Sequence, residues 1–83
     1  MHIPTIKELT STYSIDELVS AEEALLEEHS PAIEIGGNDE GEKLTHVLAA
    51  IWILRKMGED AGLSFSQAVR DYTRKVRTSI SSD

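Results

Sequence analysis

The 83-residue sequence contains no cysteine. Disulfide bonds, zinc-thiolate sites and thiol nucleophiles are therefore excluded. Long hydrophobic runs are also missing, since the run from Val47 to Leu54 is too short to span a bilayer. The first residues, MHIPTIKEL, lack the basic and apolar stretches of a signal peptide. These absences predict one small soluble domain, residues 1–83, in the cytoplasm.

Basic residues are scarce. The chain has 8 Lys and Arg against 15 Asp and Glu, a formal net charge of -7. This argues against binding to nucleic acid or to anionic membranes, which both require an excess of positive charge. The charge is unevenly spread: residues 1–42 carry 11 acids and one base (-10), whereas residues 43–83 carry seven bases and four acids (+3). We expect the two halves to attract each other.

The sequence contains four helical patterns and no internal repeat. Pro4 suits the first turn of a short helix with Tyr13 near its end. Ser14 and Glu17 form a capping box that begins a second helix ending at about Glu28. The apolar stripes of these two helices are Ile3, Ile6 and Leu9, and Ile15, Leu18, Val19, Leu25 and Leu26.

Two further capping signals follow. Asp39 with Glu42 begins a third helix, and Ser64 with Gln67 begins a fourth after the break at Gly58 and Gly62. The fourth helix has an apolar stripe of Phe65, Ala68, Val69, Tyr72, Val76 and Ile80. Its outer face carries Arg70, Arg74 and Arg77, which we expect to meet acidic side chains in the same chain or across a dimer.

Between the second and third helices the pattern changes. Residues 32–35 alternate with the period of two that is typical of a strand. A lone strand has no partner in its own chain, so it would pair across a dimer; otherwise the segment is an extended connection. The predicted fold is therefore mainly all-α, a small four-helix domain with one short extended segment near 32–35.

The third helix is apolar on two sides. At 100° per residue, one face holds Leu44, Val47, Leu48, Ile51 and Leu54, and the other holds His46, Ala49, Ala50, Ile53 and Met57. Three other short helices have little surface with which to cover both. We therefore predict a homodimer, with Ala49, Ala50, Ile53 and Met57 at the interface, because small side chains let helices approach closely.

The run AIEIGGNDEGEKLTHVLAAIWIL, preceded by YSIDELVSAEEALLEE and followed by YTRKVRTSI, resembles a small bacterial family known only as a domain of unknown function. The resemblance covers nearly the whole chain, and GEKLTHVLAAIWI is its most specific part. It implies no catalytic residues, cofactor or substrate.

One set of side chains suggests metal binding. Glu42 and His46 are spaced i, i+4 on one face of the third helix. Glu22 lies in the middle of the apolar stripe of the second helix, and His29 follows it two turns later. Inward-facing Glu and His side chains hold metals in helical bundles, although the paired Glu-x-x-His motif of those bundles is missing here. The alternative is that His46 is a hydrogen-bonded core histidine and that Glu22 meets a basic side chain.

Two functional classes remain. The leading one is a dimeric protein-protein interaction module, with no cofactor and more a binding protein than an enzyme. Its acidic face, offered to a basic partner, comprises Asp16, Glu17, Glu23, Glu27 and Glu28. The alternative is a metal-binding protein or metal-dependent enzyme that uses Glu22, Glu42 and His46.

Overall fold

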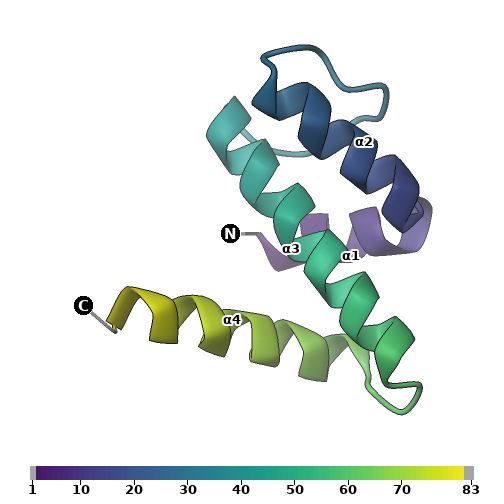
Figure 1. Cartoon of the computed structure of the whole chain (residues 1–83), viewed down its shortest axis with the longest axis vertical. Coiled ribbons are helices and arrows are strands. Elements are labelled where there is room, and N and C mark those ends of the chain that lie inside the picture. Colours follow the sequence, from purple (N-terminus) through teal and green to yellow (C-terminus); the bar gives the residue numbers. More distant parts are fainter. Residues whose placement is uncertain (1, 82–83) are drawn as a thin grey trace.

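Three helices surround a fourth, central one. The computed structural model describes residues 2–81, with side chains for residues 2–76. Its helices are α1 (Ile3–Thr12), α2 (Ile15–Leu26), α3 (Glu40–Glu59) and α4 (Phe65–Ser81). Each of α1, α2 and α4 packs against α3. In Figure 1, α1 lies behind α3, while α2 and α4 lie on opposite sides of it. The predicted four-helix, all-α architecture is confirmed.

The predicted caps begin three of the helices. Ser14 and Glu17 form the complete capping box of α2, with hydrogen bonds of 3.3 and 3.0 Å. The Asp39 carboxylate accepts the backbone N–H of Glu42 at 2.8 Å. Ser64 Oγ accepts the backbone N–H of Gln67 at 3.2 Å. Polar side chains thus satisfy exposed N–H groups in the first turns, as the sequence predicts.

Helix α2 ends in a Schellman motif. The N–H of His29 donates to the carbonyl of Ala24 at 2.7 Å, and the N–H of Glu28 donates to that of Leu25 at 3.2 Å. This geometry places Glu28 in the left-handed region, with φ of 62°. Glycine normally occupies this position because its missing Cβ removes the steric cost. The helix therefore ends just before Glu28, where the sequence pattern predicted its end.

The segment 32–35 is not a strand, and residues 2–81 contain none. The backbone bends at Ala32 and Ile33, and alternate side chains turn inward: Ile35 is buried and Ile33 half-buried, whereas Ala32 and Glu34 are exposed. The alternation therefore reflects a connecting segment that packs against the helices with one side buried. It is the second of the two readings that the sequence allowed.

The core extends along α3 and includes the face that we predicted for a dimer. Ala49, Ala50 and Ile53 are fully buried within this single chain, and Met57 packs against the same core. The small side chains thus allow close helix approach inside the protein. In this conformation Ala49, Ala50 and Ile53 offer no surface to a second copy.

Other predicted core residues behave differently. Leu26 and Leu48 belong to the expected apolar stripes but are 63% and 40% exposed. The side chains of Arg77 and Ile80 lie outside the described residues. No helix within residues 2–81 has the length and apolar character needed to cross a membrane.

The substitution Glu28→Gly should raise the free energy of unfolding by about 0.5–1 kcal/mol, because it removes the left-handed strain at the end of α2. Denaturant unfolding measures this gain. Glu28→Ala is the matched control: it removes the same charge but keeps the Cβ, so it should give no such gain. Equal stabilisation by both variants would show that charge, and not backbone geometry, is responsible.

Candidate functional site

His46 holds three parts of the chain together. Its side chain is 1% exposed. The ring atom Nε2 lies 3.1 Å from the backbone N of His2, and Nδ1 lies 2.9 Å from the carbonyl oxygen of Gly36. The backbone N–H of His2 can only donate and a carbonyl oxygen can only accept. His46 is therefore the tautomer with its proton on Nδ1, and it joins α3 to the N-cap of α1 and to the connection before α3.

Gly36 makes this arrangement possible. A Cβ at this position would lie 2.9 Å from Cγ2 of Thr5 on α1. The absence of a side chain lets the Gly36 backbone pass close to α1 and present its carbonyl to His46. Both polar atoms of the buried His46 ring have partners, which is the usual state of a buried histidine. The geometry favours the structural reading of His46 that the sequence left open.

The other predicted metal ligands lie apart from it. Glu42 is in the first turn of α3, His29 is exposed just beyond α2, and Glu22 is half-buried on the side of α2. Among the residues that the structure describes, no group of three or more His, Asp or Glu is placed to hold a metal ion. His46 itself has neither ring nitrogen free. The four predicted ligands are thus not brought together.

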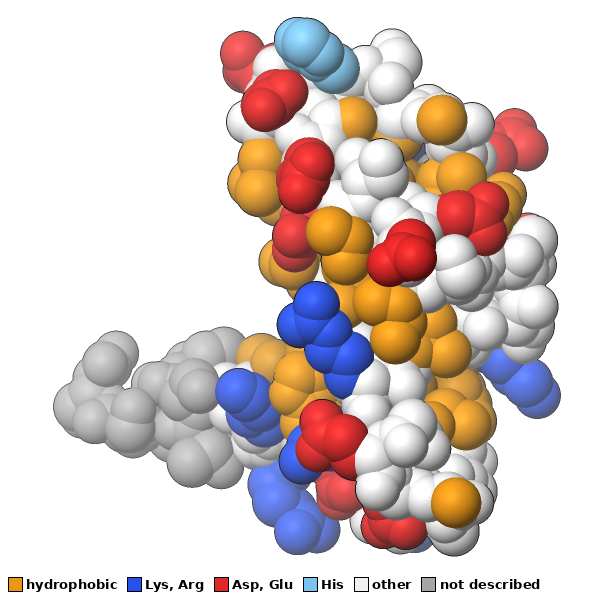
Figure 2. Space-filling model, turned by 45° about the vertical axis from the view of Figure 1, so that its right-hand side comes forward, with side chains coloured by type: hydrophobic (Ala, Val, Ile, Leu, Met, Phe, Trp, Pro, Cys, Tyr) orange, Lys and Arg blue, Asp and Glu red, His pale blue; other side chains and the backbone are white. Residues whose placement is uncertain are grey.

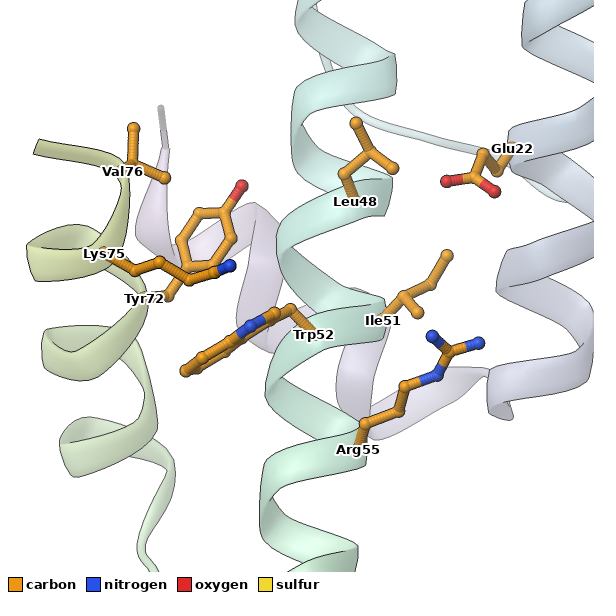
Figure 3. Close-up of a pocket in the computed structure, with 8 residues that line it drawn as sticks. All are labelled: Glu22, Leu48, Ile51, Trp52, Arg55, Tyr72, Lys75 and Val76. Carbon is orange, nitrogen blue, oxygen red and sulfur yellow. The ribbon is translucent and has the colours of Figure 1, made fainter. Parts of the chain in front are cut away.

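A groove of about 450 Å³ runs over α3 between α2 and α4. Figure 3 shows its floor formed by α3, with α4 on one side and α2 on the other. The lining side chains are Glu22 from α2, Leu48, Ile51, Trp52 and Arg55 from α3, and Tyr72, Lys75 and Val76 from α4. The groove brings together residues far apart in the sequence, and we take it as the candidate site.

Two aromatic side chains line the groove on its α4 side (Figure 3). The rings of Trp52 and Tyr72 are 5.5 Å apart between centroids and inclined by 57°, an arrangement that aromatic pairs favour. The ammonium of Lys56 lies 5.5 Å from the centroid of the Trp52 ring. Burial raises the pKa of the Tyr72 hydroxyl above its ordinary value of 10.0. The pair ties α4 to α3 and leaves part of both rings at the surface.

The exposed large hydrophobic side chains gather at this groove. Four are exposed among the described residues: Leu48 and Val76 line the groove, Leu26 lies one helical turn beyond Glu22 on α2, and only Ile3 is elsewhere. Figure 2 shows hydrophobic side chains across the middle of the molecule, with acidic side chains above and below them and basic ones nearby. Apolar area surrounded by charge is typical of a protein-protein interface.

The sequence pattern assigned these groove residues to the core. Leu48, Tyr72 and Val76 share apolar stripes with side chains that are indeed buried, and helical periodicity does not distinguish the centre of a stripe from its edge. The available signal was the width of the apolar surface on the third helix. That width predicted a face available to a second copy, and the small residues Ala49 and Ala50 directed the prediction to a side of α3 that is buried within the single chain.

In solution the His46 ring should carry its proton on Nδ1 at mildly alkaline pH, because Nε2 accepts the His2 N–H. Long-range ¹H–¹⁵N NMR correlations of the imidazole nitrogens distinguish the two tautomers. The exposed His29 serves as an internal control and should show the tautomer mixture of a solvated ring. A proton found on Nε2 of His46 would contradict the bond to His2.

Raising the pH above about 10 should lower the free energy of unfolding, since the raised pKa of Tyr72 means that its hydroxyl ionises more readily in the unfolded chain. Tyr72→Phe should remove the part of this decrease in the free energy of unfolding that comes from ionisation of Tyr72. Denaturant unfolding at neutral and at alkaline pH measures it. Tyr13→Phe, at the second of the two tyrosines, is the matched control, and equal effects of the two variants would contradict the assignment to Tyr72.

Comparison with known proteins identifies the family of this chain but no activity. No curated protein and no solved structure gave a significant match. The model of a family of unknown function (DUF6952) matches residues 1–81, nearly the whole chain. This confirms the resemblance noted from the GEKLTHVLAAIWI run and its flanking segments. The chain belongs to this family of unknown function.

Proposed function

We propose that this protein is a small helical protein-protein interaction module that works as a homodimer, with a second copy covering the groove over α3. The observation that carries the proposal is that three of the four large hydrophobic side chains exposed among residues 2–76 lie in or beside this groove. Exposed apolar side chains are ordinary when scattered, but together they indicate a binding surface. The adjacent Trp52 and Tyr72 are of the residue types enriched at interface centres.

The shape of the molecule supports face-to-face pairing. Its principal extents are 33 × 33 × 19 Å, so it is a flat body about two helices thick. Figure 1 looks down the short axis, with α1 behind α3. The groove is thus on the broad face opposite α1. A second copy against this face would cover α3 on its remaining side.

Charge supports a second copy over an unrelated partner. Helix α2 carries four acids, Asp16, Glu17, Glu22 and Glu23, and no base. Helix α4 carries four bases, Arg70, Arg74, Lys75 and Arg77, and the single acid Asp71, a net +3. A groove flanked by opposite charges finds both complements on another copy of itself. A purely basic or purely acidic partner would be repelled by one flank.

The substitution Leu48→Glu should convert the dimer to a monomer. Each copy would place a carboxylate where an apolar side chain was buried, and two such sites per dimer should weaken association at least about 100-fold. Native mass spectrometry and light scattering over a concentration series measure this. Thermal unfolding should still show a folded monomer, because Leu48 is 40% exposed in the single chain.

Ile3→Glu is the matched control. Ile3 is 38% exposed, similar to Leu48, but lies on α1 and outside the groove, so this variant should stay dimeric. A wild-type protein that is monomeric at high concentration, or dimerisation unaffected by Leu48→Glu, would overturn the proposal.

A further inference from the structure

We infer that the two-fold axis of the dimer runs along α3, so that the basic α4 of each copy packs over the acidic α2 of the other. This inference rests on the proposed homodimer and specifies which surfaces meet. It identifies the acidic surface of α2 as the binding site for the α4 helix of a second copy.

The arrangement of the helices leaves two limiting geometries. In Figures 1 and 3, α2 and α4 flank α3 on opposite sides. When two identical groove faces meet, the two-fold axis lies in the plane between them. An axis along α3 places α4 of one copy over α2 of the other. An axis across α3 places α4 over α4 and α2 over α2.

Charge distinguishes these geometries. With the axis along α3, a helix of net charge -4 meets a helix of net charge +3, twice in each dimer. With the axis across α3, two acidic helices meet and two basic helices meet. Like charges placed opposite each other at an interface are costly. Arg55, on the α2 side of the groove floor, offsets one acidic charge in either geometry and does not reverse the preference.

The apolar side chains agree with the same axis. Rotation about an axis along α3 leaves each side chain at its own height along that helix. Figure 3 shows Val76 on α4, Leu48 on α3 and Glu22 on α2 at the same level. Val76 would therefore reach the partner's α2 beside Glu22 and the following turn, which carries Leu26. These two exposed side chains, 39% and 63% accessible, would cover each other across the interface.

Charge reversal tests this pairing. One variant carries Glu22→Lys and Glu23→Lys on α2, and a second carries Arg74→Glu and Lys75→Glu on α4. Each should dimerise at least about tenfold more weakly than wild type, because the attraction between the two helices is lost: the first variant changes the net charge of α2 from -4 to 0, and the second changes that of α4 from +3 to -1. A third variant with all four substitutions should dimerise more strongly than either two-site variant, since the substituted positions of the two helices again carry opposite charges. Thermal unfolding confirms that each variant is folded.

The other axis gives a different pattern. If α2 met α2 and α4 met α4, each two-site variant would reduce the repulsion between like-charged helices, and its dimer would be at least as strong as wild type. That result would overturn the inferred axis and leave the homodimer standing. A monomeric wild type would instead overturn the proposed function itself. The two failures are therefore distinguishable.

Cysteine crosslinking provides a second test that does not depend on charge. The chain has no natural cysteine, so Leu26→Cys and Val76→Cys each introduce a single exposed thiol. A short bismaleimide should crosslink a mixture of the two variants into a dimer much more efficiently than either variant alone. Crosslinking of each variant to itself, with none gained in the mixture, would overturn the inferred axis.

Discussion

A 20-residue helix that is apolar on most of its sides has to be covered by three other helices, and this constraint organises the whole structure. Helix α1 covers one face, and α2 and α4 cover the flanks. The fourth face remains as a groove because no further helix within residues 2–81 packs there. Small domains bury a limited share of their surface. In this protein, much of the apolar surface that stays uncovered lies at this groove.

The buried face of α3 is positioned by a polar interaction within an apolar core. His46 accepts the N–H of His2 and donates to the carbonyl of Gly36, so one ring sets both the start of α1 and the end of the connection from α2. The N–H of His2 and the carbonyl of Gly36 both belong to residues outside the helices. The ring nitrogens of His46 are buried and would be costly without partners, and these two backbone groups provide a partner for each. This explains a histidine in an otherwise apolar run without requiring a catalytic role.

The segregation of charge has a related consequence. Acids on α2 and bases on α4 are kept apart by α3, so the attraction expected between the two halves of the chain is not satisfied by direct packing of these two helices. Opposite charges on the two sides of an apolar groove make the surface complementary to itself. Membership of a family of unknown function leaves the biological role to experiment, and the groove is the feature of this chain on which such experiments can act.

Local chemistry determined the secondary structure. Ser14, Asp39 and Ser64 cap helices where the sequence predicts, because capping depends only on a side chain and the backbone three residues later. The end of α2 and the four-helix composition follow from equally local signals. The alternation at 32–35 was local too, but a strand requires a partner backbone at hydrogen-bonding distance, and none is supplied within residues 2–81.

Only the tertiary structure decided which apolar residues were covered. Ala49 and Leu48 are neighbours in one apolar run, yet one is fully buried and the other is 40% exposed. Periodicity identifies the sides of a helix but not which neighbour packs on each side. The same limit applies to the metal hypothesis, because Glu42 and His46 have ligand spacing while the ring nitrogens of His46 bond to His2 and Gly36. Sequence by itself determined the helices and their charges; packing between distant segments determined the groove, since that depends on where each helix lies in space.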